Sequence, residues 1–218
     1  MEIILNVHVL KNSFVNLYLI LEPEGMTLID TGMPKGGATL VLETIKNLGR
    51  EAKDLKRILI THADPDHTGS VQALKAATGA SVYASRLDGE KMALGLPGRP
   101  GKGVVGVLTK YLMPAPAPQT ADVFLEDGQE LPVLGGLQAI FTPGHTPGHV
   151  SYFSASQKIL FAGDSLNTMG GKLQFMAGPF TDDFLAGQKS VQLQAKLGAE
   201  VVCCGHGAPL KGTLKFPF

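Results

Sequence analysis

The chain has 218 residues, of which 44% are hydrophobic and 17% charged, a composition that suits a folded protein and excludes a disordered one. Its 19 basic residues balance its 19 acidic residues, so we expect no nucleic acid and no membrane as a partner. The start lacks the features of a signal peptide, and no apolar run is long enough to span a membrane. The only cysteines are the adjacent Cys203 and Cys204, which build no disulfide framework and favour a cytoplasmic location.

The first half of the chain alternates short apolar runs with turn residues and helical spacing. The helix after the polar cluster is predicted to take Asp66 or Thr68 as its N-cap and to stop at Gly79. Strands are predicted at 2–9, 14–21, 26–30, 56–61 and 81–84, and helices at 40–49 and 69–78.

The second half begins with a segment of different character, at about 86–119. Its stretches LGLPGRPGKG and MPAPAPQ are rich in glycine and proline and are predicted to be loops. Between them, apolar residues fall on one helical stripe from Val104 to Leu112. Strands are then predicted at 123–125, 130–133, 137–141, 150–154, 158–162 and 200–204, with a helix at 182–197.

Metal-competent side chains recur where the predicted strands end. Two histidines and two aspartates lie within the six positions from His62 to His67, and the others stand beside glycine later in the chain. Imidazole and carboxylate are the ligands that Zn, Fe and Mn prefer. The candidate metal ligands are His62, Asp64, Asp66, His67, His145, Asp164 and His206.

These motifs follow one another in the order shown by the metallo-β-lactamase superfamily, which the chain resembles from NLYLILEPEGMTLIDTG to CCGHGAPL. The resemblance implies an α/β fold, the αββα four-layer sandwich of two mixed β-sheets flanked by helices, with residues 1–218 as a single domain. It also implies two divalent metal ions, with Asp30 beneath them. The implied ligands are His62, Asp64 and His145 at one metal and Asp66, His67 and His206 at the other, with Asp164 bridging.

The chain departs from the family pattern at one position. Where the family usually has H-x-H-x-D-H, this sequence has H-x-D-x-D-H, with Asp64 in place of the second histidine. A carboxylate oxygen at position 64 is as many bonds from Cα as the imidazole Nδ1 would be. Three carboxylates beside two divalent ions reduce the site charge from +2 to +1 and favour Fe or Mn over Zn.

The resemblance implies a hydrolase in which a metal-activated water attacks an ester-like bond. Asp66 and Asp164 are expected to orient the site and to pass a proton to the leaving group. The sequence contains no flavodoxin-like region and no glyoxalase II-type helical region after the last motif, so a short glyoxalase II-like thioesterase or lactonase is expected. The alternatives are a mono-iron persulfide dioxygenase and a catalytically silent metal-binding member.

The segment at 86–119 has two open interpretations. Residues 86–118 carry a formal charge of +3, and the apolar stripe lies between Gly/Pro-rich breaks. A flap would cover the apolar part of a small-molecule substrate and attract an anionic group. An exposed stripe would equally suit a homodimer contact.

Overall fold

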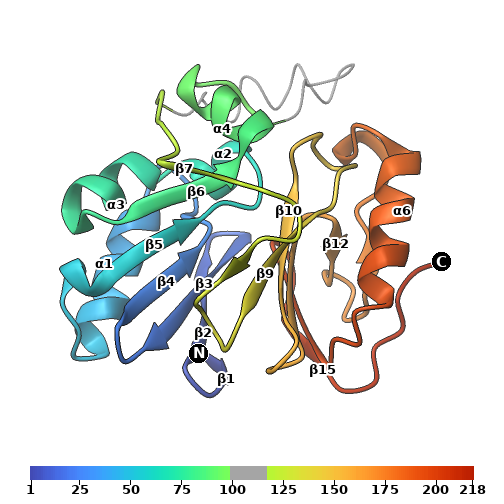
Figure 1. Cartoon of the computed structure of the whole chain (residues 1–218), viewed down its shortest axis with the longest axis horizontal. Coiled ribbons are helices and arrows are strands. Elements are labelled where there is room, and N and C mark those ends of the chain that lie inside the picture. The colour runs from blue at the N-terminus through green and yellow to red at the C-terminus, as the bar shows by residue number, and fades with distance from the viewer. Residues whose placement is uncertain (99–116) are drawn as a thin grey trace.

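The computed structural model describes residues 1–98 and 117–218. The predicted apolar stripe from 104 to 112 therefore lies outside the described residues, and so does most of the segment predicted to be a flap or a dimer contact. Two β-sheets face each other, and helices cover the outer side of each (Figure 1). This arrangement is the four-layer α/β sandwich that the sequence predicts.

The first sheet is mixed, with antiparallel pairing from β1 to β4 and parallel pairing from β4 to β7. Its strands, in spatial order, are β1 (Glu2–Ile4), β2 (Val7–Asn12), β3 (Val15–Glu22), β4 (Gly25–Ile29), β5 (Leu55–Leu59), β6 (Ser81–Ser85) and β7 (Val123–Leu125).

The second sheet is also mixed, because β11 and β14 are parallel while their other neighbours are antiparallel. Its strands are β15 (Leu210–Lys211), β14 (Val201–Cys204), β11 (Ile159–Gly163), β10 (Val150–Ser154), β9 (Leu137–Phe141) and β8 (Glu130–Leu131). A small separate hairpin consists of β12 (Leu166–Asn167) and β13 (Gln174–Phe175).

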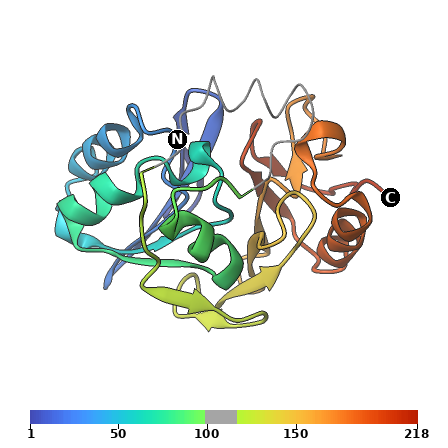
Figure 2. The ribbon, with the colours of Figure 1, turned by 90° about the horizontal axis from the view of Figure 1, so that it is seen from above.

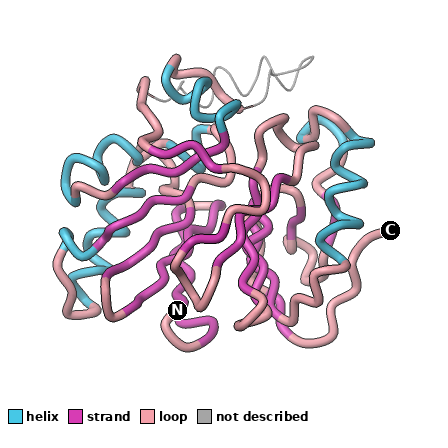
Figure 3. The backbone as a smooth tube through the Cα atoms, in the orientation of Figure 1, coloured by secondary structure: helices cyan, strands magenta, loops and turns pink. Residues whose placement is uncertain are grey.

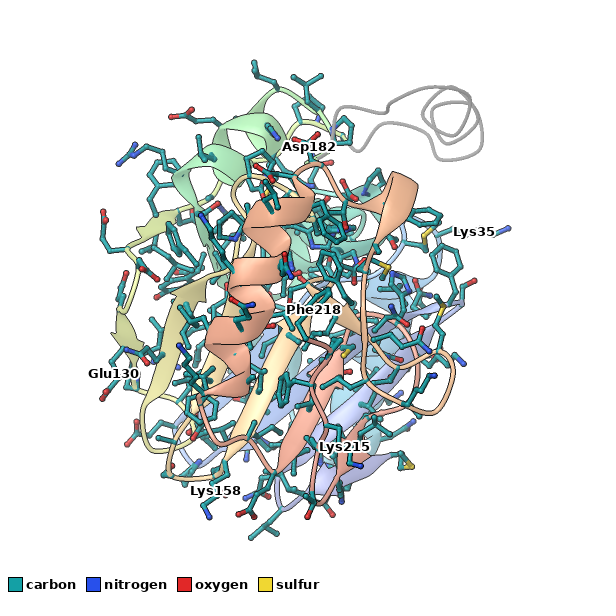
Figure 4. All side chains as sticks on the ribbon, turned by 90° about the vertical axis from the view of Figure 1, so that its right-hand side faces the viewer. Lys35, Glu130, Lys158, Asp182, Lys215 and Phe218 are labelled. Atoms are coloured by element: carbon teal, nitrogen blue, oxygen red, sulfur yellow. The ribbon has the colours of Figure 1, made fainter. Side chains whose placement is uncertain are left out.

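The helices divide between the two outer layers. Figure 3 shows them on both flanks of the strands, and Figure 4 looks onto α6, with Asp182 labelled near one end of the helix and Phe218 beside it. They are α1 (Gly37–Asn47), η1 (Ala52–Asp54), α2 (Pro65–Thr68), α3 (Val71–Thr78), α4 (Arg86–Ala93), η2 (Gly178–Phe180) and α6 (Phe184–Ala195).

Side-chain alternation along β3 explains the layering. Leu17 and Leu19 pack in the cluster beneath α1 and α3, while Tyr18 and Ile20 pack in the cluster between the sheets. Successive side chains of a strand point to opposite faces, so a strand apolar at every position is buried on both faces. A third cluster joins the second sheet to α6, through Val191 among others.

Several predicted boundaries agree with the structure and others are wrong. The strands at 123–125, 137–141 and 150–154 are confirmed. The single strand predicted at 2–9 is wrong: the chain turns at Asn6, whose φ is 65°, and forms two strands. The short hairpin of β12 and β13 was not predicted, and neither was the short strand β15.

Two predictions about helices also need correction. Residues 86–93, for which no helix was predicted, form α4, and the Ser85 hydroxyl caps it by accepting a hydrogen bond from the Asp88 N–H. The helix predicted at 69–78 is α3, which begins only at Val71, and the short helix α2 precedes it at Pro65–Thr68. Ser70 precedes α3, so neither predicted N-cap is right, whereas Gly79 ends the helix in a left-handed conformation as predicted.

Among the described residues, no helix is both long enough and apolar enough to cross a membrane.

Candidate metal centre

The seven predicted ligands all follow the C-terminal ends of strands, and the structure brings them together at one edge of the two sheets. His62 to His67 follow β5 of the first sheet, whereas the other three follow β9, β11 and β14 of the second. Figure 2 views the molecule from above, onto the side where α2 lies. The centre is therefore built from both halves of the chain.

The first group consists of His62, Asp64 and His145. The Nε2 atoms of the two histidines are 3.2 Å apart. Asp64 Oδ2 lies 3.7 Å from His62 Nε2 and 3.4 Å from His145 Nε2. All three residues are buried. Their facing atoms define a compact triangle.

The second group consists of Asp66, His67 and His206. Asp66 Oδ2 lies 3.6 Å from the Nε2 atoms of both His67 and His206. Asp164 lies between the two groups, with its carboxylate 3.6 Å from His145, 3.6 Å from His67 and 3.0 Å from His206. This placement agrees with the bridging position that the family resemblance implies for Asp164.

One turn of helix positions the densest part of the cluster. Pro65 stands in the first turn of α2, where a missing N–H costs nothing. The Asp64 carbonyl accepts the N–H groups of His67 and Thr68 and the Thr68 hydroxyl. These hydrogen bonds are accepted by the backbone carbonyl of Asp64 and not by its carboxylate. The side chain can therefore face His62 and His145.

Asp30 lies beneath the centre and sets the orientation of two imidazoles. Its carboxylate accepts the Thr61 N–H at 2.9 Å, the Thr61 hydroxyl at 2.8 Å and His67 Nδ1 at 2.7 Å. Since Thr61 Oγ1 donates to Asp30, it can only accept from His62 Nδ1, 3.0 Å away. Both imidazoles therefore carry a proton on Nδ1 and turn Nε2 toward the centre.

His206 is oriented by the turn between β2 and β3. Its Nδ1 donates to the Phe14 carbonyl at 2.9 Å, which leaves Nε2 toward Asp164. The Phe14 ring stacks on the imidazole, with centroids 5.7 Å apart and planes inclined by 22°. Half of the Phe14 side chain is exposed, so it forms part of the rim.

His149 lies behind Asp164. Its Nε2 accepts the Asp164 N–H at 3.0 Å, and its Nδ1 therefore donates to Thr142 Oγ1 at 2.8 Å. Thr142 bonds Ser151, which also receives a hydrogen bond from Gln194 of α6. A continuous buried network thus fixes the backbone of Asp164 to the outer helix.

The charges of the cluster divide the histidines into two kinds. Burial, helped by the charge of His67, lowers the pKa of His62, and burial lowers the pKa of His149 well below its usual value. Burial also opposes protonation of His67, but Asp164 and Asp30 raise its pKa well above the usual value. Burial raises the pKa of Asp164, yet His206 and His67 hold it well below its usual range. Without metal, Asp164 therefore favours the protonated forms of His67 and His206.

The spacing and the unpaired atoms fit a metal centre. Four ligands at 2.0–2.1 Å in a tetrahedron stand about 3.3 Å apart, close to the separations of 3.2 to 3.7 Å within the first group. His67 Nε2 and Asp164 Oδ1 are buried without a hydrogen-bond partner among residues 1–98 and 117–218. Buried polar atoms are rarely left unpaired in native proteins, so these two atoms suit coordination.

The space around the Asp64 side chain is limited by the backbone of Gly98. A Cβ added at Gly98 would lie 3.3 Å from Asp64 Oδ1 and 2.8 Å from Thr146 Cγ2. The backbone at Gly98 therefore fills the space next to Asp64. An imidazole at position 64 would extend beyond the carboxylate oxygens into that space.

Asp88, a buried residue of α4, contacts the centre and was missed by the sequence analysis. Its carboxylate accepts a hydrogen bond from Thr146, the residue after His145, at 3.0 Å. The two residues are 58 positions apart. No local motif joins them, so only the folded chain reveals the contact.

The family comparison agrees with this geometry. Residues 10–206 match the profile described as the metallo-beta-lactamase superfamily. The chain is 32% identical to a probable metallo-hydrolase of Bacillus subtilis, YflN, over 94% of this chain and 85% of that protein. It is 36% identical to a hydroxyacylglutathione hydrolase of Albidiferax ferrireducens, over 83% of this chain but only 58% of that protein.

Solved structures show the same fold. A metallo-β-lactamase of Cronobacter sakazakii, described by its HARLDQ motif, superposes with a TM-score of 0.72 at 26% identity, over 93% of this chain and 75% of that one. MEM-A1, a subclass B3 metallo-β-lactamase from a soil metagenome, superposes with the same TM-score of 0.72 at 24% identity, over 92% and 76%.

Proposed function

Since this chain belongs to the metallo-β-lactamase superfamily and is a metal-dependent hydrolase of that fold, we propose that it cleaves an ester-like bond, either a thioester or a lactone. The observation that carries the proposal is the presence of two three-residue groups. Within each group, the potential ligand atoms lie within 4.8 Å of one another. One group is His62, Asp64 and His145, and the other is Asp66, His67 and His206.

In this proposal each group would hold one divalent ion, and Asp164 lies between the two groups. Such ions would supply a Lewis acid for the carbonyl oxygen and would lower the pKa of water at the centre. Asp64 adds a hard oxygen ligand, which favours iron or manganese over zinc. Asp30, through His67 and Thr61, occupies the Nδ1 atoms of His67 and His62 and keeps their Nε2 atoms aimed inward.

Asp66 is the carboxylate best placed to pass a proton to the leaving group. Its side chain is 11% exposed, compared with 4% for Asp64 and 5% for Asp164. A proton donor must reach the leaving group from the open side of the centre. Asp164 is instead surrounded by three histidines and serves to orient them.

The rim supports a substrate with an apolar part. Phe14 is 50% exposed above His206, and Met169 is 69% exposed next to the loop of Gly207. An aromatic ring stacked on a ligand histidine offers an apolar wall to an acyl chain. We also propose that the substrate carries an anionic group and that the segment near 86–119 forms a homodimer contact.

One observation favours a second candidate. His62, Asp64 and His145 are two histidines and one carboxylate, the set that non-haem Fe(II) oxygenases use. A mono-iron persulfide dioxygenase would need iron and would consume oxygen, whereas a catalytically silent member would bind metal without turnover.

The test combines elemental analysis with assays on the purified protein. We expect up to two metal ions per chain and turnover of a thioester or a lactone, and we expect His145→Ala to abolish this turnover and to reduce the amount of bound metal. Oxygen uptake with a persulfide would favour the dioxygenase instead. A protein that binds no metal even after reconstitution would refute the proposal.

A further inference from the structure

Asp88 is a residue of α4 whose carboxylate is buried. The residue is 1% exposed, and its backbone N–H donates to the Ser85 hydroxyl at 3.2 Å. Its Oδ1 has no hydrogen-bond partner among the described residues and lies 4.0 Å from Lys91 Nζ. Burying a carboxylate is costly unless its contacts compensate, so these contacts indicate what the residue does.

One set of contacts reaches the loop of His145. Asp88 Oδ2 accepts the Thr146 hydroxyl, and Thr146 immediately follows His145. A Cβ added at Gly148 would lie 2.9 Å from Asp88 Cγ and 2.6 Å from Ser85 Oγ, so the backbone of this loop packs directly on the start of α4. Any shift of Asp88 would therefore move the residues next to His145.

A second set of contacts runs from α4 to the loop of His62 and Asp64. Lys91 donates to the Gly98 carbonyl, and a Cβ added at Gly98 would lie 3.1 Å from the Ala63 nitrogen and 3.3 Å from Asp64 Oδ1. The pKa of Asp88 is raised to about 6, chiefly by burial, with Lys91 and Thr146 opposing. Ala63 stands between His62 and Asp64. The carboxylate thus lies between two loops that belong to different sheets.

Lys91 extends the same arrangement by one more contact. Its ammonium group lies near Asp88 and donates to the Gly98 carbonyl, and the Gly98 backbone packs against Asp64 and Thr146. Helix α4 therefore contacts the loops of the first ligand group at Asp64 and Thr146.

We propose that Asp88 is a positioning residue that holds the ligand loops of His62, Asp64 and His145 at the separation one metal ion requires. This inference rests on the proposed function. Among the described contacts, Asp88 bonds no candidate ligand; it acts through Thr146, and through Lys91 and Gly98 on the loop of Asp64. Outer partners of this kind typically change metal affinity by 10–100-fold. The second group, with Asp66, His67 and His206, has no contact with Asp88 among those described and should be unaffected.

The test uses a matched pair at position 146 on the whole protein. Thr146→Val keeps the shape and removes the donor, whereas Thr146→Ser keeps the donor. We expect Thr146→Val and Asp88→Ala to weaken one of two Zn²⁺ sites at least tenfold in competition with a chromophoric chelator, and Thr146→Ser to retain native affinity. The Co²⁺ spectrum should change for one ion only. Thr78→Val, at a buried threonine of α3, is the control.

The possible outcomes are distinct. Unchanged affinity at both sites in Thr146→Val would overturn the positioning role, and so would equal losses at both sites that track a lower melting temperature. If Asp88→Ala does not fold, the pair at position 146 decides alone. A native protein that binds no metal would refute the proposed function, whereas a native protein with two sites insensitive to these variants would refute only the role of Asp88.

Discussion

At the scale of single residues, Asp30 influences more of the centre than any ligand does alone. It has a φ of 60°, a left-handed conformation that aspartate tolerates better than most residues. From there one carboxylate receives three hydrogen bonds and, directly or through Thr61, orients the imidazoles of His67 and His62 so that their Nε2 atoms face the centre.

We predict that Asp30→Asn weakens metal binding about 10–100-fold, because its amide cannot accept all three hydrogen bonds and leaves His67 free to turn. Metal competition titrations would measure the loss. Asp54→Asn, at a carboxylate that caps a surface turn, is the control and should bind metal normally. Native affinity in Asp30→Asn would show that Asp30 does not orient the ligands.

A second prediction concerns pH in the metal-free protein. Burial alone would lower the pKa of His206, but the neighbouring Asp164 carboxylate outweighs this effect, and the net result is a pKa raised to about 9. A folded pKa above the unfolded value of about 6.5 means that the His206–Asp164 pair stabilises the fold fully below about pH 6.5. That contribution is lost as the pH rises through about 9.

Thermal unfolding of chelator-treated protein would show this loss. The native chain should exceed His206→Gln in melting temperature near neutral pH, and the difference should shrink as the pH approaches about 10. A constant difference over this range would mean that His206 is not protonated in the folded, metal-free protein.

At the scale of elements, the contact between α6 and the loop of His145 is made by two glycines. The Gly144 carbonyl accepts the N–H groups of Asp182 and Asp183, just before α6. A Cβ at Gly144, whose φ is +145°, would lie 2.3 Å from the Gly187 Cα. Only a residue without a side chain allows this approach.

We predict that Gly144→Ala destabilises the protein by more than about 3 kcal/mol, because it combines overpacking against α6 with an unfavourable φ. It should also weaken metal binding at His145. Gly79→Ala is the matched control: its φ is +73° but no atom lies within 4 Å, so only the backbone cost of about 1–2 kcal/mol applies. Equal losses in chemical denaturation would refute the steric account.

The elements also show what could be predicted from the sequence. The ligands were predictable because each follows an apolar strand and stands in a short polar motif. Helix α4 was not, because Gly89 lies within it and Gly/Pro-rich sequence follows. Strands of two residues, such as β12, carry too little pattern to be recognised, and the contact of Asp88 with Thr146 depends on the packing of distant segments.

At the scale of the whole molecule, the centre joins two sheets that otherwise meet through an apolar core. Four candidate ligands follow β5 in the first sheet, and three follow strands of the second. Between the sheets lie residues such as Tyr18, Leu59 and Phe161, all buried. Metal binding should therefore act as a cross-link between the halves of the chain.

We predict that removing metal lowers the stability of the whole fold rather than loosening one loop. A ligand at 100 times its Kd adds about 2.7 kcal/mol to the folded state, which for a chain of this size raises the melting temperature by about 5–10 °C. Scanning calorimetry with and without chelator would measure the shift, and readdition of Zn²⁺ or Mn²⁺ should restore it. His145→Ala, which removes a ligand from the second sheet, should respond less to metal than the native chain. If chelator leaves the native melting temperature unchanged although metal is shown to leave, the ligands of the two sheets are not joined through a common centre.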